Sequence, residues 1–156
     1  MQTHFGVDSE DSTILLVEDN PDDVLLIRRA FQKANLANPM KVASDGEEAI
    51  RYLSGTDQFA DRSAYPMPLF VLLDLKLPRI GGLEVIEWAR NQQGLRCMPI
   101  VVLTSSVQDE DVKHAYHAGA NSYLVKPVEF ENLISMAKTL NLYWVVMNVR
   151  PDLRTC

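Results

Sequence analysis

The fold is indicated by residues 13–23, which read TILLVEDNPDD. The apolar segment Thr13–Glu18 does not alternate with polar residues, as is typical of a β-strand that is buried on both faces. Asn20 is a typical N-cap, Pro21 is favoured at the first position of a helix, and the two aspartates that follow complement the helix dipole. These residues therefore predict a buried strand that leads directly into a helix.

The same alternation continues along the chain. Further strands are expected at Lys41–Ala43, Leu69–Asp74, Pro99–Thr104 and Asn121–Val125. Helices are expected at 21–34, 45–54, Leu83–Gln92, Gln108–Ala118 and Glu129–Met147. Short apolar strands that alternate with helices predict an α/β fold, with a parallel sheet covered by helices on both faces.

Length and charge limit the function classes. The 156 residues fit one domain, which we expect over 13–147, between a polar N-terminal tail over 1–12 and a C-terminal tail over 148–156. A net charge of −6 without a basic run argues against nucleic acid as a partner. The apolar runs are too short to span a bilayer, and the N-terminal segment lacks the apolar core of a secretory signal. A cytoplasmic protein without a membrane partner is expected.

The two cysteines, Cys97 and Cys156, do not show a metal-ligand spacing. Cys97 precedes an expected strand and Cys156 is the last residue, so we expect one buried thiol and one thiol on a mobile tail. Two separate thiols fit a reducing compartment.

Polar residues stand where four of the expected strands end. Glu18 and Asp19 follow the first strand, Asp74 ends the third, Thr104 ends the fourth and Lys126 follows the fifth. Each of them alone has an ordinary interpretation as a helix cap, a turn residue or a solvated charge. Ligands of open parallel sheets bind beyond the carboxyl ends of the strands, so together they predict a site at that edge.

Three clustered carboxylates repel one another, by about 4 kcal/mol for one pair at ~4 Å and an effective dielectric constant near 20. A divalent cation removes this repulsion, and an all-oxygen site suits Mg²⁺. A carboxylate beside a metal ion, a lysine and a hydroxyl is a plausible nucleophile for in-line phosphoryl transfer. Thr104 and Lys126 are then expected to contact the phosphoryl oxygens.

Four motifs resemble the receiver domain of two-component response regulators. They are Val17–Asn20, Leu73–Pro78 followed by Gly81 and Gly82, Leu103–Ser106, and Tyr123–Pro127, and they occur in the family's order. The resemblance extends from about Thr13 to Leu140. It implies a doubly wound, flavodoxin-like fold with five parallel strands in the order 2-1-3-4-5 and five flanking helices.

The resemblance also implies roles for single residues. Asp74 would accept a phosphoryl group from a phosphohistidine of a sensor histidine kinase. Asp19 and Asp74 would bind Mg²⁺ directly and Glu18 mainly through water, while the backbone carbonyl of Lys76 would be a further ligand.

The remaining motif residues match the parts of the family's switch. Thr104 matches the switch hydroxyl, Lys126 the lysine that pairs with the phosphoryl group, and Tyr123 the switch aromatic residue. The protein is thus expected to be a phosphoacceptor whose own activity is limited to self-phosphorylation from small phosphodonors and autodephosphorylation.

Two features resemble the stand-alone regulators of cyanobacterial phytochrome histidine kinases, which form homodimers. They are the long loop Thr56–Pro68 and the apolar run Leu142–Met147, which covers the whole circumference of a helix. We therefore expect a homodimer through Gln108–Ala118, the strand before Lys126 and the last helix, although the run could instead pack on its own sheet.

Other functions were weighed against this interpretation. A Mg²⁺-dependent phosphatase of the haloacid dehalogenase type needs a second aspartate two residues after Asp74, where this chain has Lys76. A nucleotide-binding module needs a phosphate-binding loop after the first strand, and residues 18–22 are acidic there. A receiver-like protein with a purely structural role is disfavoured, because all five site residues are present. A receiver that serves a kinase of another type stays open.

Overall fold

The computed structural model describes residues 12–156, so residues 1–11 of the expected N-terminal tail lie outside the described part. Within it, one sheet of parallel strands has the order β2-β1-β3-β4-β5, which confirms the expected topology. The strands are β1 (Ile14–Val17), β2 (Met40–Ala43), β3 (Phe70–Leu73), β4 (Ile100–Thr104) and β5 (Ser122–Val125).

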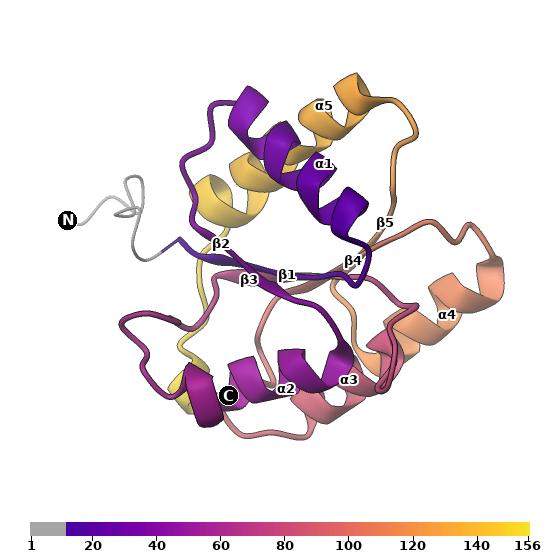
Figure 1. The fold of residues 1–156 in the computed structure, drawn as a ribbon. Coiled ribbons are helices and arrows are strands. Elements are labelled where there is room, and N and C mark those ends of the chain that lie inside the picture. The colour runs from indigo at the N-terminus through magenta and orange to yellow at the C-terminus, as the bar shows by residue number, and fades with distance from the viewer. Residues whose placement is uncertain (1–11) are drawn as a thin grey trace.

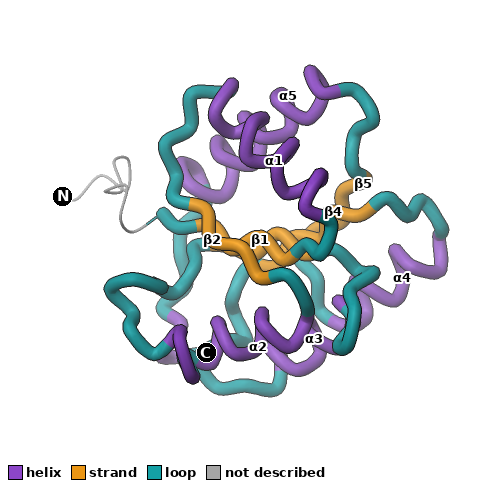
Figure 2. The backbone as a smooth tube through the Cα atoms, in the orientation of Figure 1, coloured by secondary structure: helices purple, strands orange, loops and turns teal. Residues whose placement is uncertain are grey.

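Helices cover both faces of this sheet (Figures 1 and 2). They are α1 (Pro21–Lys33), α2 (Gly46–Ser54), α3 (Gly82–Arg90), α4 (Asp109–Ala118) and α5 (Phe130–Leu140). In Figure 1, α1 and α5 lie on the upper face and α2, α3 and α4 on the lower face.

The core has two layers because successive side chains of a strand point to opposite faces. Ile14 and Leu16 of β1 pack in the layer beneath α1 and α5. Leu15 and Val17 pack in the layer on the side of α2 and α3. Both layers are apolar, which explains why the sequence of β1 shows a continuous apolar run.

Capping residues set the ends of the helices as expected. The Asn20 side chain accepts a hydrogen bond from the backbone N–H of Asp22 at 2.9 Å, and the Asp45 side chain accepts one from Glu48 at 2.7 Å. Gly55 and Gly119 end α2 and α4 with φ angles of 68° and 118°, which few residues other than glycine adopt readily.

The long loop after α2 is ordered by aromatic packing. It contains one 3₁₀ turn, η2 (Asp57–Phe59), and Phe59 is buried. The ring of Phe59 lies 5.2 Å from that of Tyr52 and 5.1 Å from that of Tyr65. Arg62 donates to the carbonyls of Tyr52 and Leu53, so the loop is fixed to the end of α2.

The last helix differs from the single α-helix expected over Glu129–Met147. α5 ends at Leu140, and a π-helical segment, η3 (Asn141–Met147), continues it. Within this segment the ring of Trp144 stacks on the ring of Phe70, with 6.3 Å between the ring centroids. Leu142, Tyr143 and Met147 are exposed. The apolar run thus packs partly on its own sheet and is partly exposed.

The expectation of two separate thiols is wrong, because Cys97 and Cys156 form a disulfide. Cys97 is also exposed instead of buried. The two cysteines are 59 positions apart, and this spacing alone does not reveal that they pair.

No helix within residues 12–156 is both long enough and apolar enough to span a bilayer.

Candidate functional site

The register between β1 and β3 brings Glu18 and Asp74 together. Val17 pairs with Leu73, and the backbone N–H of Asp74 donates to the Val17 carbonyl at 3.0 Å. Glu18 and Asp74 are the next residues along the two parallel strands, so both stand at the carboxyl edge of the sheet. Both are buried, and Glu18 is only 2% exposed.

The register between β4 and β5 places Thr104 and Lys126 next to each other at the same edge of the sheet. Thr104 pairs with Val125, and the N–H of Lys126 donates to the Thr104 carbonyl at 2.8 Å. Thr104 is buried at the end of β4, beside the strand that carries Asp74. The structure thus brings the predicted residues to one edge of the sheet.

Three carboxylates form a group that fits a metal ion. Ligand oxygens of Glu18, Asp19 and Asp74 lie within 4.8 Å of one another. Asp19 is exposed and opens the group to solvent. The backbone N–H of Lys76 donates to Asp74 Oδ1 at 3.2 Å, so the loop after β3 folds around the Asp74 carboxylate. A set of oxygen ligands with one side open to water suits a hard divalent cation.

Lys126 is the cation within this acidic group. Its Nζ lies 2.9 Å from Asp74 Oδ2, 3.1 Å from both carboxylate oxygens of Glu18, and 2.9 Å from Asp23 Oδ2. From the sequence alone, Asp23 is expected only to complement the dipole of the helix. Its position in the first turn of α1, directly after the first strand, was the signal that it also faces the site.

Burial and mutual repulsion set the protonation of the group. Burial first, and then Asp74, raise the pKa of Glu18 to about 8 from its ordinary value of 4.5. Burial acts in the same direction on Asp74, but hydrogen bonds from Glu18 and Lys126 outweigh it and lower the pKa of Asp74. Burial alone would lower the pKa of Lys126, but its bonds to Asp74 and Asp23 raise it. Near neutral pH, Asp74 and Lys126 are therefore charged, and Glu18 is mostly protonated when no metal ion is bound.

Tyr123 connects β5 to the loop after β4. Its half-buried side chain donates from the hydroxyl to the backbone carbonyl of Ser106 at 3.0 Å. The Ser106 hydroxyl bonds Asp111 in α4, and it also accepts from the N–H of Gln108. Ser106 was noted only as part of a motif, yet it joins Tyr123 to α4.

The second glycine of the Gly81–Gly82 pair lies against the site. A Cβ atom at Gly82 would overlap the carbonyl oxygen of Asp74 and would lie 2.7 Å from the Cα of Leu75. At Gly81 the nearest atom to such a Cβ is 3.8 Å away. The close approach of α3 to Asp74 therefore requires glycine at position 82 alone.

The chain is similar in sequence to known proteins. Residues 14–138 match the family described as the response regulator receiver domain. The chain is 37% identical over 154 residues to the probable methanogenesis regulatory protein FilR2 of Methanothrix harundinacea, which covers 94% of this chain and 97% of FilR2. It is 30% identical over 132 residues to the response regulator Rcp1 of Synechocystis, which covers 85% of this chain and 88% of Rcp1.

Solved structures agree with the sequence relatives. The response regulator RPA3017, described in red light signalling of R. palustris, superposes with a TM-score of 0.86 at 32% identity and covers 90% of this chain and 98% of its own. The Mn²⁺-bound form of Rcp1 gives a TM-score of 0.79 at 29% identity, covering 90% of this chain and 99% of its own. The matched family spans the sheet and every strand end that bears a site residue, and the chain belongs to the response regulator receiver domain family.

Proposed function

We propose that this chain is a single-domain response regulator that accepts a phosphoryl group on Asp74 from a sensor histidine kinase. The observation that carries the proposal is the carboxylate of Asp74, which is buried, ionised and bonded to Lys126 at the open acidic edge of the sheet. Residues 13–147 would form the receiver unit, and its output would be made through protein contacts.

The transfer itself needs few groups. An oxygen of Asp74 would attack the phosphorus of a phosphohistidine in line with the bond that breaks, so that an O–P bond forms. The P–N bond breaks, and the histidine nitrogen leaves with the electron pair and takes up a proton. Lys126, already 2.9 Å from Asp74, would pair with one phosphoryl oxygen, and the Thr104 hydroxyl would donate to another.

We infer that Glu18, Asp19, Asp74 and the Lys76 carbonyl hold Mg²⁺. The proximity of the three carboxylates supports this inference, and so does the related Rcp1, whose structure is described as Mn²⁺-bound. When bound, the ion would neutralise negative charge on the acidic group and on the phosphoryl oxygens. Glu18 would then lose its proton, because the cation offsets the repulsion between the Glu18 and Asp74 carboxylates that favours the protonated form.

The kinase would dock beside the site. α1 begins there, and it exposes Leu25 and Leu26, which are 47% and 42% exposed. An apolar surface next to a buried nucleophile suits a helical partner that presents its phosphohistidine to Asp74. Relatives described as phytochrome response regulators support a kinase of the phytochrome type, and such a relay would operate in the cytoplasm without membrane or nucleic-acid contact.

A homodimer would form at the β5 edge of the sheet, through α4, β5, α5 and η3. An apolar groove there is lined by Leu124, Met136, Leu140, Tyr143 and Trp144. Leu142 and Met147 extend it as exposed apolar residues. Two copies related by a two-fold axis would cover each other's groove and the free edge of β5, and Asp74 would stay accessible to the kinase.

Phosphoryl acceptance is tested with acetyl phosphate as donor, with and without Mg²⁺. We expect wild-type protein to be labelled with Mg²⁺ and labelling to fall roughly tenfold or more in EDTA. Asp74→Asn should abolish labelling. Asp57→Asn is the matched control, because Asp57 is an exposed aspartate in the loop after α2 and should be labelled like wild type. Undiminished labelling of Asp74→Asn would contradict the assignment.

The kinase is tested by mixing the protein with a panel of phosphorylated sensor kinases. We expect a phytochrome-type kinase to transfer its phosphoryl group fastest, and Leu26→Glu to slow that transfer without slowing labelling by acetyl phosphate. Equal transfer from every kinase would contradict the proposed pairing.

The dimer is tested by sedimentation. Tyr143→Glu places a charge in the groove and should weaken self-association by roughly tenfold or more. Leu25→Glu is the control, since Leu25 has similar exposure but lies on α1. Trp144 is unsuitable for this test because it packs on Phe70 of its own chain. A wild-type protein that sediments as a monomer at tens of micromolar would exclude the interface.

A further inference from the structure

The chain that follows η3 crosses from one face of the sheet to the other. Trp144 packs in the layer beneath α1 and α5, whereas Leu153 packs in the opposite layer. We call residues 148–156 the C-terminal segment. In Figure 1 this segment runs in yellow past the sheet and ends near α2. Its path places the end of the chain on a face that the last helix does not contact.

The crossing takes place at the edge of the sheet opposite Asp74. Arg150, Pro151 and Leu153 share a groove with residues that directly precede two strands. These residues are Met67, Pro68 and Leu69 before β3, and Met98 and Pro99 before β4. The C-terminal segment therefore covers the amino ends of the strands, whereas the phosphoacceptor site lies at their carboxyl ends.

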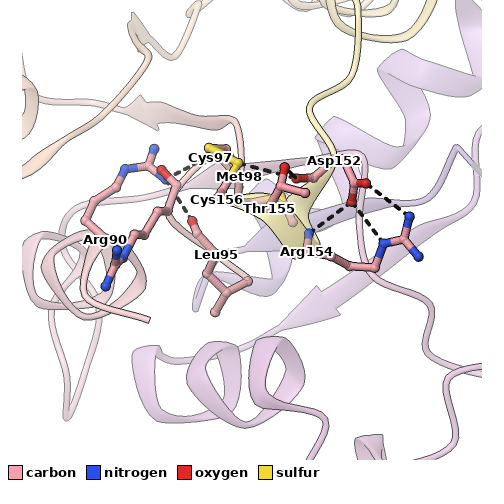
Figure 3. Close-up of a disulfide and its surroundings, with 9 residues drawn as sticks. Arg90, Leu95, Cys97, Met98, Asp152, Arg154, Thr155 and Cys156 are labelled. Atoms are coloured by element: carbon pink, nitrogen blue, oxygen red, sulfur yellow. Dashed lines mark hydrogen bonds and ion pairs between the residues drawn. A yellow bond between two sulfur atoms is a disulfide. The ribbon is translucent and has the colours of Figure 1, made fainter. Parts of the chain in front are cut away.

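The disulfide ties this segment to the domain (Figure 3). Within the segment, the Asp152 side chain accepts hydrogen bonds from the backbone and the guanidinium of Arg154, and its carbonyl accepts one from the Thr155 hydroxyl. These bonds shape the segment itself. Leu153 is half-buried and supplies its apolar anchor. The covalent bond to Cys97 is the strongest tie between the end of the chain and the domain.

The segments that carry Cys97 and Cys156 are held in different ways. Arg90, which is in α3, donates to the carbonyls of Leu95, Arg96 and Met98, on both sides of Cys97. It also donates to the Gly119 carbonyl at 2.8 Å, so the loop that presents Cys97 is fixed to the end of α4. Cys156 lies in the C-terminal segment, which Leu153 anchors by apolar packing. Cleavage of the disulfide would therefore leave Cys97 in place, while the position of Cys156 would depend on the packing of Leu153.

We propose that Cys97 and Cys156 form a reversible redox site that controls whether the C-terminal segment is locked over the amino ends of β3 and β4. In the oxidised protein the segment is locked. In the reduced protein it is released, and the groove between it and the strands is open. The site is separate from Asp74 and acts at the opposite edge of the sheet.

The co-reactant is a low-molecular-weight disulfide or thiol such as glutathione. In the oxidising direction a Cys97 thiolate attacks oxidised glutathione, one glutathione thiolate leaves, and Cys156 then attacks the Cys97 sulfur and releases the second. Two electrons pass from the cysteine pair to glutathione, and each released thiolate takes up a proton. Excess reduced glutathione reverses both steps, since Cys97 is exposed to solvent.

Reversibility follows from the compartment, and this step rests on the proposed function. A receiver that takes phosphoryl groups from a cytoplasmic kinase works where thiols are kept reduced. A disulfide in such a compartment is transient, and an exposed one is open to thiol–disulfide exchange.

The experiment uses the full chain, equilibrated over a series of ratios of reduced to oxidised glutathione and then alkylated. We expect both cysteines to lose their thiols together, within one chain, and to recover them in reduced glutathione. Amide hydrogen exchange of Arg154, Thr155 and Cys156 should be at least about tenfold faster in the reduced protein, while the amides of β3 and β4 stay protected. Cys97→Ser and Cys156→Ser should exchange like reduced wild type in either buffer.

Three outcomes overturn the proposal. They are a Cys156 thiol that stays open to alkylation in oxidised glutathione, a bond that resists reduced glutathione, and exchange at residues 154–156 that is equal in the two redox states. Labelling of Asp74 by acetyl phosphate is measured in parallel and should be unchanged within about twofold, because the site lies at the other edge of the sheet. Failure of that labelling in both redox states would contradict the phosphoacceptor assignment and leave the redox result intact.

Discussion

Lys126 contacts carboxylates from three parts of the chain, which are Glu18, Asp23 and Asp74. Burial first, and then the neighbouring Asp74, raise the pKa of Glu18 to about 8, so near neutral pH Glu18 is mostly protonated when no metal ion is bound. One ammonium group also cannot neutralise three carboxylates. The same deficit of positive charge is what a divalent cation would relieve. The protonation of Glu18 and the binding of a metal ion are therefore alternatives at one site.

This competition predicts how the stability of the metal-free protein depends on pH. A carboxyl group with a pKa of about 8 in the folded chain and 4.5 in the unfolded chain binds its proton more tightly when folded. The stabilisation of the fold by the Glu18 proton is fully present below pH 4.5, and it is lost as the pH rises through about 8. We expect the free energy of unfolding to fall between about pH 5 and pH 8 in EDTA.

Urea unfolding at several pH values in EDTA measures this slope, and Glu18→Gln is the control because it keeps the shape of the side chain and does not titrate. The variant should lose most of the slope, and Mg²⁺ should also reduce it in the wild type. Parallel pH curves for wild type and Glu18→Gln would show that Glu18 is not the titrating group.

At the scale of elements, the loop between β3 and α3 is shaped by contact with the site. Gly82 is the first residue of α3, and its Cα faces the Asp74 carbonyl so closely that a Cβ has no space. Helix α3 therefore begins directly beside the loop that follows Asp74, and any side chain at position 82 displaces that loop.

Gly82→Ala should accordingly lower the free energy of unfolding by about 1–3 kcal/mol, the usual cost of overpacking. It should also slow labelling of Asp74, because the backbone of Asp74 and Leu75 must move. Gly81→Ala is the matched control, since a Cβ there finds ordinary contacts and φ is −72°. Denaturant unfolding and acetyl phosphate labelling measure both effects, and equal losses in the two variants would refute the steric explanation.

The link between β5 and the loop after β4 is a second element-scale feature. Tyr123 bonds the Ser106 carbonyl, and Ser106 bonds Asp111 in α4. A phosphoryl group on Asp74 would draw Thr104 toward it, and the loop that follows Thr104 would carry this movement to Tyr123 and α4.

Tyr123→Phe removes the hydroxyl and keeps the ring. We expect it to accept phosphate on Asp74 about as well as wild type, with a smaller change in the environment of α4 upon phosphorylation. NMR shifts of α4 amides, with and without phosphorylation, measure this change. Tyr116→Phe on α4 is the control, because Tyr116 is an exposed tyrosine. A full response in Tyr123→Phe would exclude the hydroxyl from the coupling.

At the scale of the whole molecule, the disulfide closes the chain from the loop before β4 to its last residue. Closing a loop of 59 residues removes conformational freedom from the unfolded chain and stabilises the fold by up to about 4 kcal/mol. The gain is an upper limit, because release of the C-terminal segment also gives freedom to the reduced native state.

We therefore expect the melting temperature of the oxidised protein to exceed that of the reduced protein by up to about 10 °C. Calorimetry with and without a reductant measures the difference, and Cys156→Ser should melt at the reduced temperature in both buffers. Identical melting of both redox forms of the wild type would mean that the bond does not restrain the unfolded chain.

The sequence by itself determined the α/β fold and the residues at the strand ends. The spacing of apolar residues and the capping of helices are local properties of the sequence. They can be recognised directly where an apolar strand such as Ile14–Val17 precedes a capped helix such as the one after Asn20. The site residues follow from the same rule, because in a parallel sheet every strand ends at the same edge.

Tertiary structure decided the contacts that join distant segments. Asp23 reaches Lys126 across 103 positions, and Cys156 reaches Cys97 across 59. Trp144, in the π-helical segment, likewise stacks on Phe70 of β3, which is distant in the sequence. Local patterns specify the direction of a side chain relative to its own element, but partners from other elements are set by how those elements pack, and no single stretch of the sequence contains that information.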